Sequence, residues 1–239
     1  MATSQVAESD PEARKIFEEV DRRRDKISFE QSDMKMIIYN SRGQTRERLI
    51  QSFSSNRDGN SNSLLIFEEP ANVAGTGFLT ISEGADEIQK LYLPALDRIQ
   101  VISASQKSDR FMGSDFTYED LGDQDPEDYR FELESKTDSA FVLKAEKKES
   151  SQYHYIRFYI DSEKYALVQA EYFDEDDTMI KRLESTGFQN VMEDVWRPRT
   201  MTMYDLINDR KTTLSWSNRT FNESIPAWRF TERGLKRGI

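Results

Sequence analysis

Cysteine is absent from the 239-residue chain, and histidine occurs once, as His154. Without cysteine the chain has no disulfide, no thiolate nucleophile and no cysteine-bound zinc or iron–sulfur site. No Gly-x-Ser-x-Gly element accompanies His154, so a Ser-His-Asp arrangement has no local support. The residue begins the alternating series His154, Ile156 and Phe158, which favours a strand-end position near the boundary of the core. The sequence therefore predicts no catalytic residue.

Positive charge is in the minority, and long apolar runs are missing. Lysine and arginine number 33 against 44 aspartates and glutamates, which gives a net charge of −11. Binding to nucleic acid or to an anionic lipid surface needs a basic face, so neither is predicted. No apolar stretch approaches the roughly 20 residues that span a bilayer, and the opening M-A-T-S-Q is unlike a secretory signal. The 14 Phe, 10 Tyr and 3 Trp nevertheless indicate a folded core.

Two short motifs resemble ligand-binding loops only in part. Gly75-Thr76-Gly77 lacks the third glycine and the lysine of a phosphate-binding loop, so a bulge or tight bend is favoured. Residues 123–128 alternate acids as a calcium loop does, but Pro126 replaces a flexible position and the central glycine is missing. A solvated acidic rim is the favoured interpretation, with weak calcium binding as the alternative. We predict no metal centre and no cofactor.

The N-terminal region combines an unpatterned end with one helix. Residues 1–9 carry no hydrophobic pattern and are predicted to be flexible. Asp10 is a suitable N-cap and Pro11 a suitable first helical residue, so a helix is predicted over residues 11–24. Its apolar face consists of Ala13, Ile16, Phe17 and Val20.

After this helix the hydrophobic period changes to two. Alternation predicts strands within residues 34–38, 46–53, 64–67, 77–81, 89–93, 130–135, 141–146, 153–161, 166–173, 179–184, 199–206 and 212–216. Short polar turns join most of them, which indicates an up-and-down antiparallel meander that curls into all or part of a barrel. We predict a single domain over residues 10–239, with further helix somewhere in residues 95–121 and near the C-terminus.

The most distinctive segment is residues 110–122, R-F-M-G-S-D-F-T-Y-E-D-L-G. It follows neither a helical nor a strand period, which indicates a compact loop. We expect Asp115 to accept hydrogen bonds from backbone N–H groups, and Thr117 to cap a short turn that contains Tyr118 and Asp120. The segment resembles the F-M-G-S-D-F-T-Y-E-D-L signature of bacterial proteins similar to LolA, the outer-membrane lipoprotein-sorting factor. Residues 70–79, 91–98, 196–203 and 230–235 resemble further family segments.

The resemblance implies a mainly β (α+β) fold, in which a strongly curved antiparallel sheet forms an unclosed barrel and helices cover its concave side. It also implies a periplasmic carrier, present here as the mature form without its signal peptide. The carrier would be a monomer that holds a lipid or a lipoprotein acyl chain and passes it to a membrane transporter or an outer-membrane acceptor. Combined with the strand alternation, this gives the lipid-cavity candidates Met34, Met36, Ile38, Phe67, Phe78, Leu91, Leu93, Phe111, Met112 and Phe116.

Two alternatives stay open at this point. A sensory or scaffold module of the same fold would bind a partner protein and carry no lipid. A hydrolase is disfavoured, because no catalytic motif accompanies the fold. The identity of the cargo and the direction of transfer do not follow from the residues.

Overall fold

The computed structural model describes residues 9–57, 59–84 and 86–237. The residues 1–8 of the predicted flexible end lie outside this part. The strands are β1 (Phe29–Tyr39), β2 (Thr45–Arg57), β3 (Asn60–Glu69), β4 (Gly77–Glu83), β5 (Asp86–Leu93), β6 (Arg98–Val101), β7 (Tyr129–Lys136), β8 (Ala140–Lys147), β9 (Tyr155–Asp161), β10 (Ala166–Phe173), β11 (Met179–Thr186), β12 (Gln189–Met192), β13 (Val195–Arg197), β14 (Thr200–Asp205) and β15 (Arg210–Phe221). The helices are α1 (Pro11–Arg24) and α2 (Glu232–Arg237).

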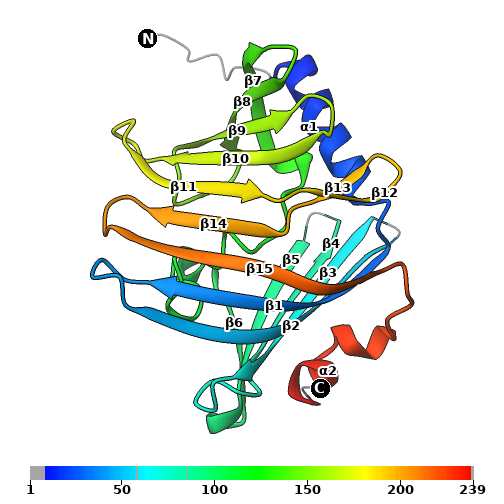
Figure 1. The fold of residues 1–239 in the computed structure, drawn as a ribbon, viewed down its shortest axis with the longest axis vertical. Coiled ribbons are helices and arrows are strands. Elements are labelled where there is room, and N and C mark those ends of the chain that lie inside the picture. Colours follow the sequence, from blue (N-terminus) through cyan, green and yellow to red (C-terminus); the bar gives the residue numbers. More distant parts are fainter. Residues whose placement is uncertain (1–8, 58, 85, 238–239) are drawn as a thin grey trace.

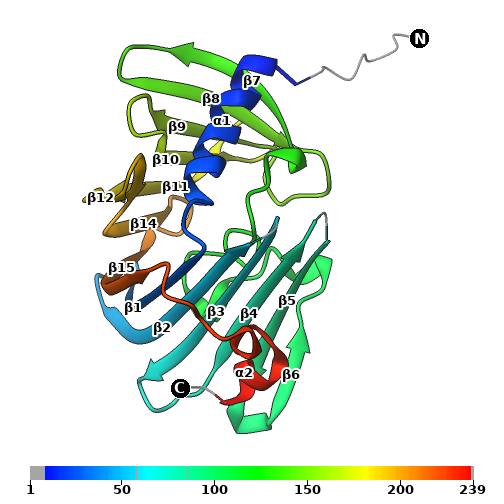
Figure 2. The same cartoon turned by 90° about the vertical axis from the view of Figure 1, so that its right-hand side faces the viewer.

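Thirteen strands form one sheet in the order β6-β5-β4-β3-β2-β1-β15-β14-β11-β10-β9-β8-β7, and β12 pairs with β13 in a separate hairpin. Every pairing recorded in the described part of the chain is antiparallel, and none joins the edge strands β6 and β7. The sheet bends strongly around one side (Figures 1 and 2). The mainly β fold with an unclosed barrel, predicted from the sequence, is confirmed.

The order of the strands differs from a simple meander. Strands β1 to β6 follow one another in one direction from the middle of the sheet, and β7 to β15 approach the middle from the other edge. The two series meet where β15 pairs with β1, for example with Trp216 opposite Met34. Consequently residues 102–128 connect the two opposite edges of the sheet. Alternation identifies the strands, but it does not say which strands become neighbours.

Helix α1 agrees with the prediction at both its ends. The Asp10 carboxylate accepts hydrogen bonds from the N–H groups of Glu12 (2.8 Å) and Ala13 (3.3 Å), and Pro11 is the first helical residue. The apolar face packs inside the sheet, where the ring centroid of Phe17 lies 4.9 Å from that of Phe131. The Asp10 N–H also donates to the Phe131 carbonyl (2.8 Å). The start of α1 thus covers part of the edge strand β7.

The other predicted helices differ in kind and place. In residues 95–121 the chain forms short 3₁₀ turns at Pro94–Leu96, Ala104–Gln106 and Phe111–Gly113 instead of an α-helix. At the C-terminus α2 is present, but it lies on the convex side against β4, and the 3₁₀ turn Ala227–Phe230 before it lies against β3 (Figure 2). There it contributes to a second apolar cluster, which consists of Phe53, Leu64, Ile66, Leu79, Ile225, Phe230 and Leu235.

The predicted bend at residues 75–77 is present between β3 and β4. Gly75 has φ +78°, a conformation that L side chains rarely adopt. Gly77 lies under α2, where an added Cβ would stand 2.6 Å from Leu235 Cδ1. Only a glycine therefore allows the C-terminal helix to approach the sheet this closely.

Candidate functional site

The candidate site is the concave side of the sheet together with residues 102–128, which cross it from β6 to β7 (Figure 2). This connecting segment is called the crossing loop. Its residues Ile102, Phe111, Phe116 and Tyr118 are buried in the main hydrophobic cluster, together with side chains from both halves of the sheet. The loop therefore fills the space that the curved strands enclose.

The ten residues predicted to line a lipid cavity come together on this side. Met34, Met36, Ile38, Phe67, Phe78, Leu91, Phe111 and Phe116 are buried in the main cluster, and Leu93 and Met112 are partly buried against it. Phe67 and Phe78 lie in continuous apolar runs, where alternation does not decide the face. Their side chains point to the same side of the sheet as those of Met34, Met36 and Ile38. Whether any of these residues contacts a lipid stays a prediction.

An apolar cavity of about 150 Å³ remains between the sheet and the crossing loop. From the predicted set, Met34, Met36, Phe78, Phe111 and Phe116 line it. The other five predicted residues do not, because they pack elsewhere in the same cluster. Sequence reasoning missed Leu65, Leu121, Leu214 and Trp216 as lining residues. Alternation places Leu214 and Trp216 on one face of β15, but only the β1–β15 pairing brings that face to Met34 and Met36.

Phe111 is the centre of the aromatic packing beneath the loop. Its side chain is completely buried. Its ring centroid lies 4.9 Å from that of Phe78, 5.8 Å from that of Phe67 and 5.8 Å from that of Tyr118. Tilted or edge-on contacts at such distances are favourable for aromatic pairs. One loop side chain thus ties β3 and β4 to the crossing loop.

Asp115 anchors the loop, but not in the predicted way. Its carboxylate accepts hydrogen bonds from Arg110 Nη1 (2.7 Å) and from the Thr212 hydroxyl (2.7 Å), and it lies 3.1 Å from Arg210 Nε. The prediction that it accepts backbone N–H groups is wrong, because side chains occupy its oxygens, that of Arg110 from the loop itself and those of Arg210 and Thr212 from β15. The backbone N–H of Asp115 instead donates to Thr212 Oγ1 (2.9 Å). The loop is therefore fastened to β15, a strand about 97 residues away.

Arg110 extends this network to the β14–β15 turn by pairing with Asp205. Burial alone would raise the pKa of Asp205, but hydrogen bonds from Asn208 and the charge of Arg110 outweigh it and hold the pKa below its usual value. A depressed pKa means that this stabilisation is present above the unfolded-state value of about 3.9 and is lost as the pH falls further. The anchor is thus fully formed at neutral pH.

The turn after Asp115 has the predicted cap. The Thr117 hydroxyl accepts from the Asp120 N–H (3.3 Å), and the Asp120 carboxylate accepts from the Thr117 N–H (2.7 Å). Asp120 also accepts from the Tyr153 hydroxyl (2.7 Å) and lies 3.2 Å from Lys181 Nζ. The carbonyl of Tyr118 accepts from Gln89 Nε2 (2.9 Å). This half of the loop is consequently attached to β5, β11 and the start of β9.

Arg48 is a charged residue on the otherwise apolar concave face. It lies opposite Met36 in the β1–β2 register, and its guanidinium carbon is 5.6 Å from the Phe67 ring centroid. Burial lowers the pKa of Arg48, and its Nη1 has no hydrogen-bond partner among the residues that the structure describes. Any acidic group introduced at Met36 would therefore find a cation across the strand pair.

Acidic side chains gather where α1 ends near the crossing loop. Burial raises the pKa of Asp21 to about 6. The charge of Arg24 opposes this shift, whereas Asp25, Asp123 and Asp125 add to it. Asp21 is thus a carboxyl group whose ionised form the fold disfavours.

We expect Asp21→Asn to increase the free energy of unfolding at pH 7 by about 1 kcal/mol. The folded-state pKa lies above the unfolded value, so ionisation of Asp21 costs stability as the pH rises from about 4 to 6, and asparagine removes that cost. Urea unfolding of both proteins at pH 4 and pH 7 measures the difference. A variant that is less stable than the parent at pH 7 would show that the pair with Arg24 dominates instead.

Other ligand chemistries find little support in the described residues. No group of three His, Cys, Asp or Glu side chains in the described ranges is arranged to hold a metal ion. His154 is exposed just before β9, and its N–H donates to the Phe173 carbonyl (2.9 Å). Within the described ranges no helix is both long enough and apolar enough to cross a membrane.

Comparison with known proteins gives one family match and several structural relatives. A model of a family of uncharacterized proteins matches residues 59–237. A domain from Vibrio parahaemolyticus, assigned to outer membrane lipoprotein sorting, is 30% identical, with 95% of this chain and 99% of that chain covered and a TM-score of 0.89. No curated protein matches the chain.

Two further solved structures share the fold at lower identity. A DUF1329 family protein from Desulfovibrio piger is 23% identical over 96% of this chain and 100% of that chain, with a TM-score of 0.88. A LolA superfamily protein from Nitrosomonas europaea is 20% identical over 94% of this chain and 98% of that chain, with a TM-score of 0.71.

Proposed function

Since the chain belongs to the LolA-like family of outer-membrane lipoprotein-sorting proteins, we propose that it binds a lipid or a lipoprotein acyl chain and passes it to a membrane partner. The apolar cavity under the crossing loop is the observation that carries this proposal. The carrier would act in the periplasm as a monomer and as one domain over residues 10–239. The Vibrio relative, which is assigned to outer membrane lipoprotein sorting, supports this compartment.

The cavity is too small for a whole acyl chain while the loop is in place. Its volume of about 150 Å³ is that of a dry cavity which accommodates a benzene-sized molecule, whereas pockets for larger ligands begin at roughly 300 Å³. Each methylene group that leaves water contributes about 0.8 kcal/mol. An acyl chain would therefore gain enough to displace Phe111 and Phe116 from part of the concave face. The cargo would take the place of the crossing loop.

Loading and release then depend on the anchors of the loop. Two groups of contacts hold the buried stretch of the loop. At one end the Asp115 network binds β15, and at the other the Asp120 turn binds β5, β11 and the residues just before β9. A ligand shifts such an equilibrium only by its difference in affinity for the two states. A carrier must give up its cargo, so the closed and open arrangements should differ by only a few kcal/mol.

The test is to place a charge in the cavity. We expect Met34→Glu to abolish binding of a fluorescent fatty acid, because Met34 is 4% exposed and its strand neighbours Ile50 and Trp216 carry no positive charge to pair with a carboxylate. Met36 is the poorer choice, since Arg48 lies opposite it. Titration of the fluorescent probe into each protein gives the affinity, and circular dichroism shows that the variant is folded.

Gln31→Glu is the matched control. It adds the same charge to the same strand at an exposed position, and it should bind the probe as the parent does. Equal binding by the parent and by Met34→Glu would contradict lipid binding at this cavity.

A scaffold module that binds a protein partner is the second candidate. The small volume of the cavity favours it, because side chains of the crossing loop and of α1 already pack inside the concave side. Native mass spectrometry of the protein purified without detergent separates the two functions. Co-purified lipid supports the carrier, whereas a mass that equals the bare chain, together with no binding of any lipid probe, supports the scaffold.

A further inference from the structure

A second, polar pocket of about 310 Å³ lies beside the apolar cavity. The β4–β5 turn, the β8 end and residues 119–128 of the crossing loop form its walls. The turn of the loop separates the two spaces, because Leu121 lines the apolar cavity whereas Glu119 and Gly122 line the polar pocket. No residue is shared between the two linings.

The polar pocket has a large excess of negative charge. Seven carboxylates and two lysines line it. Both lysines are already paired, with Lys107 Nζ 3.0 Å from Glu87 and Lys147 Nζ 3.6 Å from Glu119. Burial raises the pKa of Asp128, and the neighbouring acids Asp125, Glu149 and Glu87 raise it further against the opposing charge of Lys147. Asp123 lies 3.2 Å from Arg24 of α1. The other four carboxylates, Asp86, Asp125, Asp128 and Glu149, have no ion-pair partner among the described residues.

One buried hydroxyl without a partner lines the same space, and two further unpaired oxygens lie on the same face of the neighbouring strand pair without lining the pocket. Ser82 lines the pocket and is 6% exposed, yet its hydroxyl has no hydrogen-bond partner in the described part of the chain. Thr80 Oγ1 and Gln89 Oε1, on the same face of β4 and β5, are likewise without a partner among the described residues. Buried polar atoms in native proteins are usually satisfied, so such a group points to a missing ligand or water. Carboxylates only accept hydrogen bonds and a hydroxyl can accept them, so a ligand that donates hydrogen bonds suits both.

A bare metal ion fits these features poorly. In the described ranges no three acidic or histidine side chains are arranged around one point. A volume of about 310 Å³ is instead at the lower end of the range for small organic ligands. An ammonium group supplies one positive charge and three N–H donors, which match both the carboxylates and the unpaired oxygens.

We propose that this pocket binds an organic cation that carries primary ammonium groups. The cation would be held by Asp128 and Glu149 through charge and by the Ser82 hydroxyl through a hydrogen bond. Two sources share this chemistry, a free polyamine and the amino headgroup of a lipid. The site does not depend on lipid carriage, because its lining is separate from the apolar cavity.

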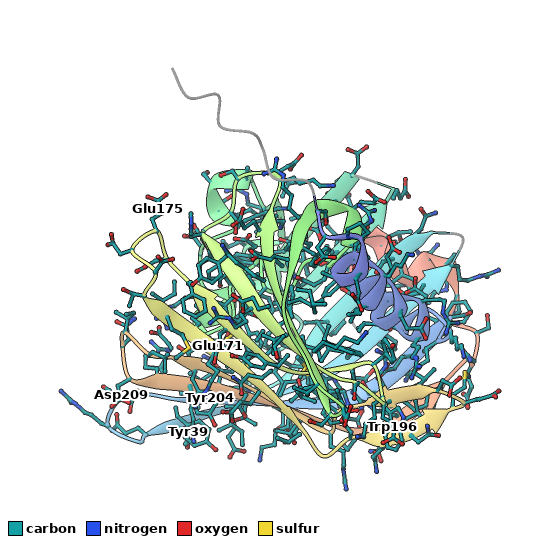
Figure 3. The ribbon with its side chains drawn as sticks, turned by 90° about the horizontal axis from the view of Figure 1, so that it is seen from above. Tyr39, Glu171, Glu175, Trp196, Tyr204 and Asp209 are labelled. Carbon is teal, nitrogen blue, oxygen red and sulfur yellow. The ribbon has the colours of Figure 1, made fainter. Side chains whose placement is uncertain are left out.

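Isothermal titration calorimetry with spermidine tests the site in the full chain. We expect saturable binding at one site, and Asp128→Asn should weaken it by roughly fivefold, the upper effect of one partly exposed charge pair. Ser82→Ala should also weaken binding while leaving the melting temperature unchanged or higher, because removal of an unsatisfied hydroxyl costs the fold nothing. Glu175→Gln is the control for charge, since Glu175 projects from the β10–β11 turn (Figure 3) and does not line the pocket.

Each result of these titrations either supports or overturns the proposed amine site. Binding of spermidine supports a free polyamine, and binding of only a short-chain phosphatidylethanolamine, but not of the matching phosphatidylglycerol, supports a lipid headgroup. No saturable binding of either amine overturns the proposal. So does equal weakening by Glu175→Gln, or displacement of spermidine by one equivalent of Ca²⁺. Spermidine binding that survives in Met34→Glu shows that this site stands even if lipid carriage fails.

Discussion

Phe111→Ala is expected to lower the free energy of unfolding by about 3–5 kcal/mol, the usual cost of truncating a buried phenylalanine. The ring is completely buried and contacts the rings of Phe67, Phe78 and Tyr118. Its removal leaves a space that the rigid strands β3 and β4 cannot collapse to fill. Urea unfolding followed by tryptophan fluorescence measures the loss.

The same substitution should improve binding of a small apolar probe. Phe111 lines the existing cavity, so alanine joins the vacated volume to the 150 Å³ already present. A dry apolar cavity takes up benzene-sized molecules, and we expect the variant to bind such a probe more tightly than the parent does. Ile207→Ala is the control, because Ile207 is 64% exposed and its truncation should change stability by less than about 0.5 kcal/mol. A stable variant with unchanged probe binding would show that the loop closes over the gap.

Asp115→Ala is expected to destabilise the fold by about 2–3 kcal/mol. The carboxylate is buried and connects Arg110, Arg210 and Thr212. Its removal leaves the Thr212 hydroxyl without its acceptor and takes one carboxylate contact from each guanidinium group. Arg110 keeps Asp205, and Arg210 keeps the Gly113 carbonyl. The cost stays below that of a fully buried ion pair, because Arg110 and Arg210 are 34% and 27% exposed and water can reach them.

Asp115→Asn separates charge from hydrogen bonding. Asparagine can still accept from Thr212, so the loss should be smaller than for alanine. Asp109→Ala, at an exposed position of the same loop, should change stability by less than about 0.5 kcal/mol. Equal stability of Asp115→Ala and the parent would mean that desolvation of this carboxylate cancels its contacts, and that the aromatic cluster alone fixes the loop.

The loosened anchor also bears on the proposed carrier. If the cargo replaces the crossing loop, Asp115→Ala should load a fluorescent fatty acid faster than the parent does, because less energy opposes opening. Stopped-flow mixing measures that rate. An unchanged loading rate would place the entrance elsewhere on the concave side.

Local patterns were sufficient wherever a few neighbouring residues decide the structure. The cap at Asp10, the proline after it and the spacing of Ile16 and Phe17 determine α1 by themselves. Alternation in β1 places Met34 and Met36 on one face whatever the partner strand is. The Thr117–Asp120 turn was predictable for the same reason, since its two hydrogen bonds span only three residues.

The tertiary structure alone decided which distant segments meet. The pairing of β15 with β1 brings Leu214 and Trp216 to the cavity and Thr212 to Asp115, and no local signal in either segment specifies its partner. The same pairing sends the crossing loop from one edge of the sheet to the other, so that its aromatic side chains reduce the enclosed space to a small cavity. The two-residue alternation along each strand thus determined which residues lie on the concave face. The volume left between them depends on the packing of side chains that are far apart in the chain.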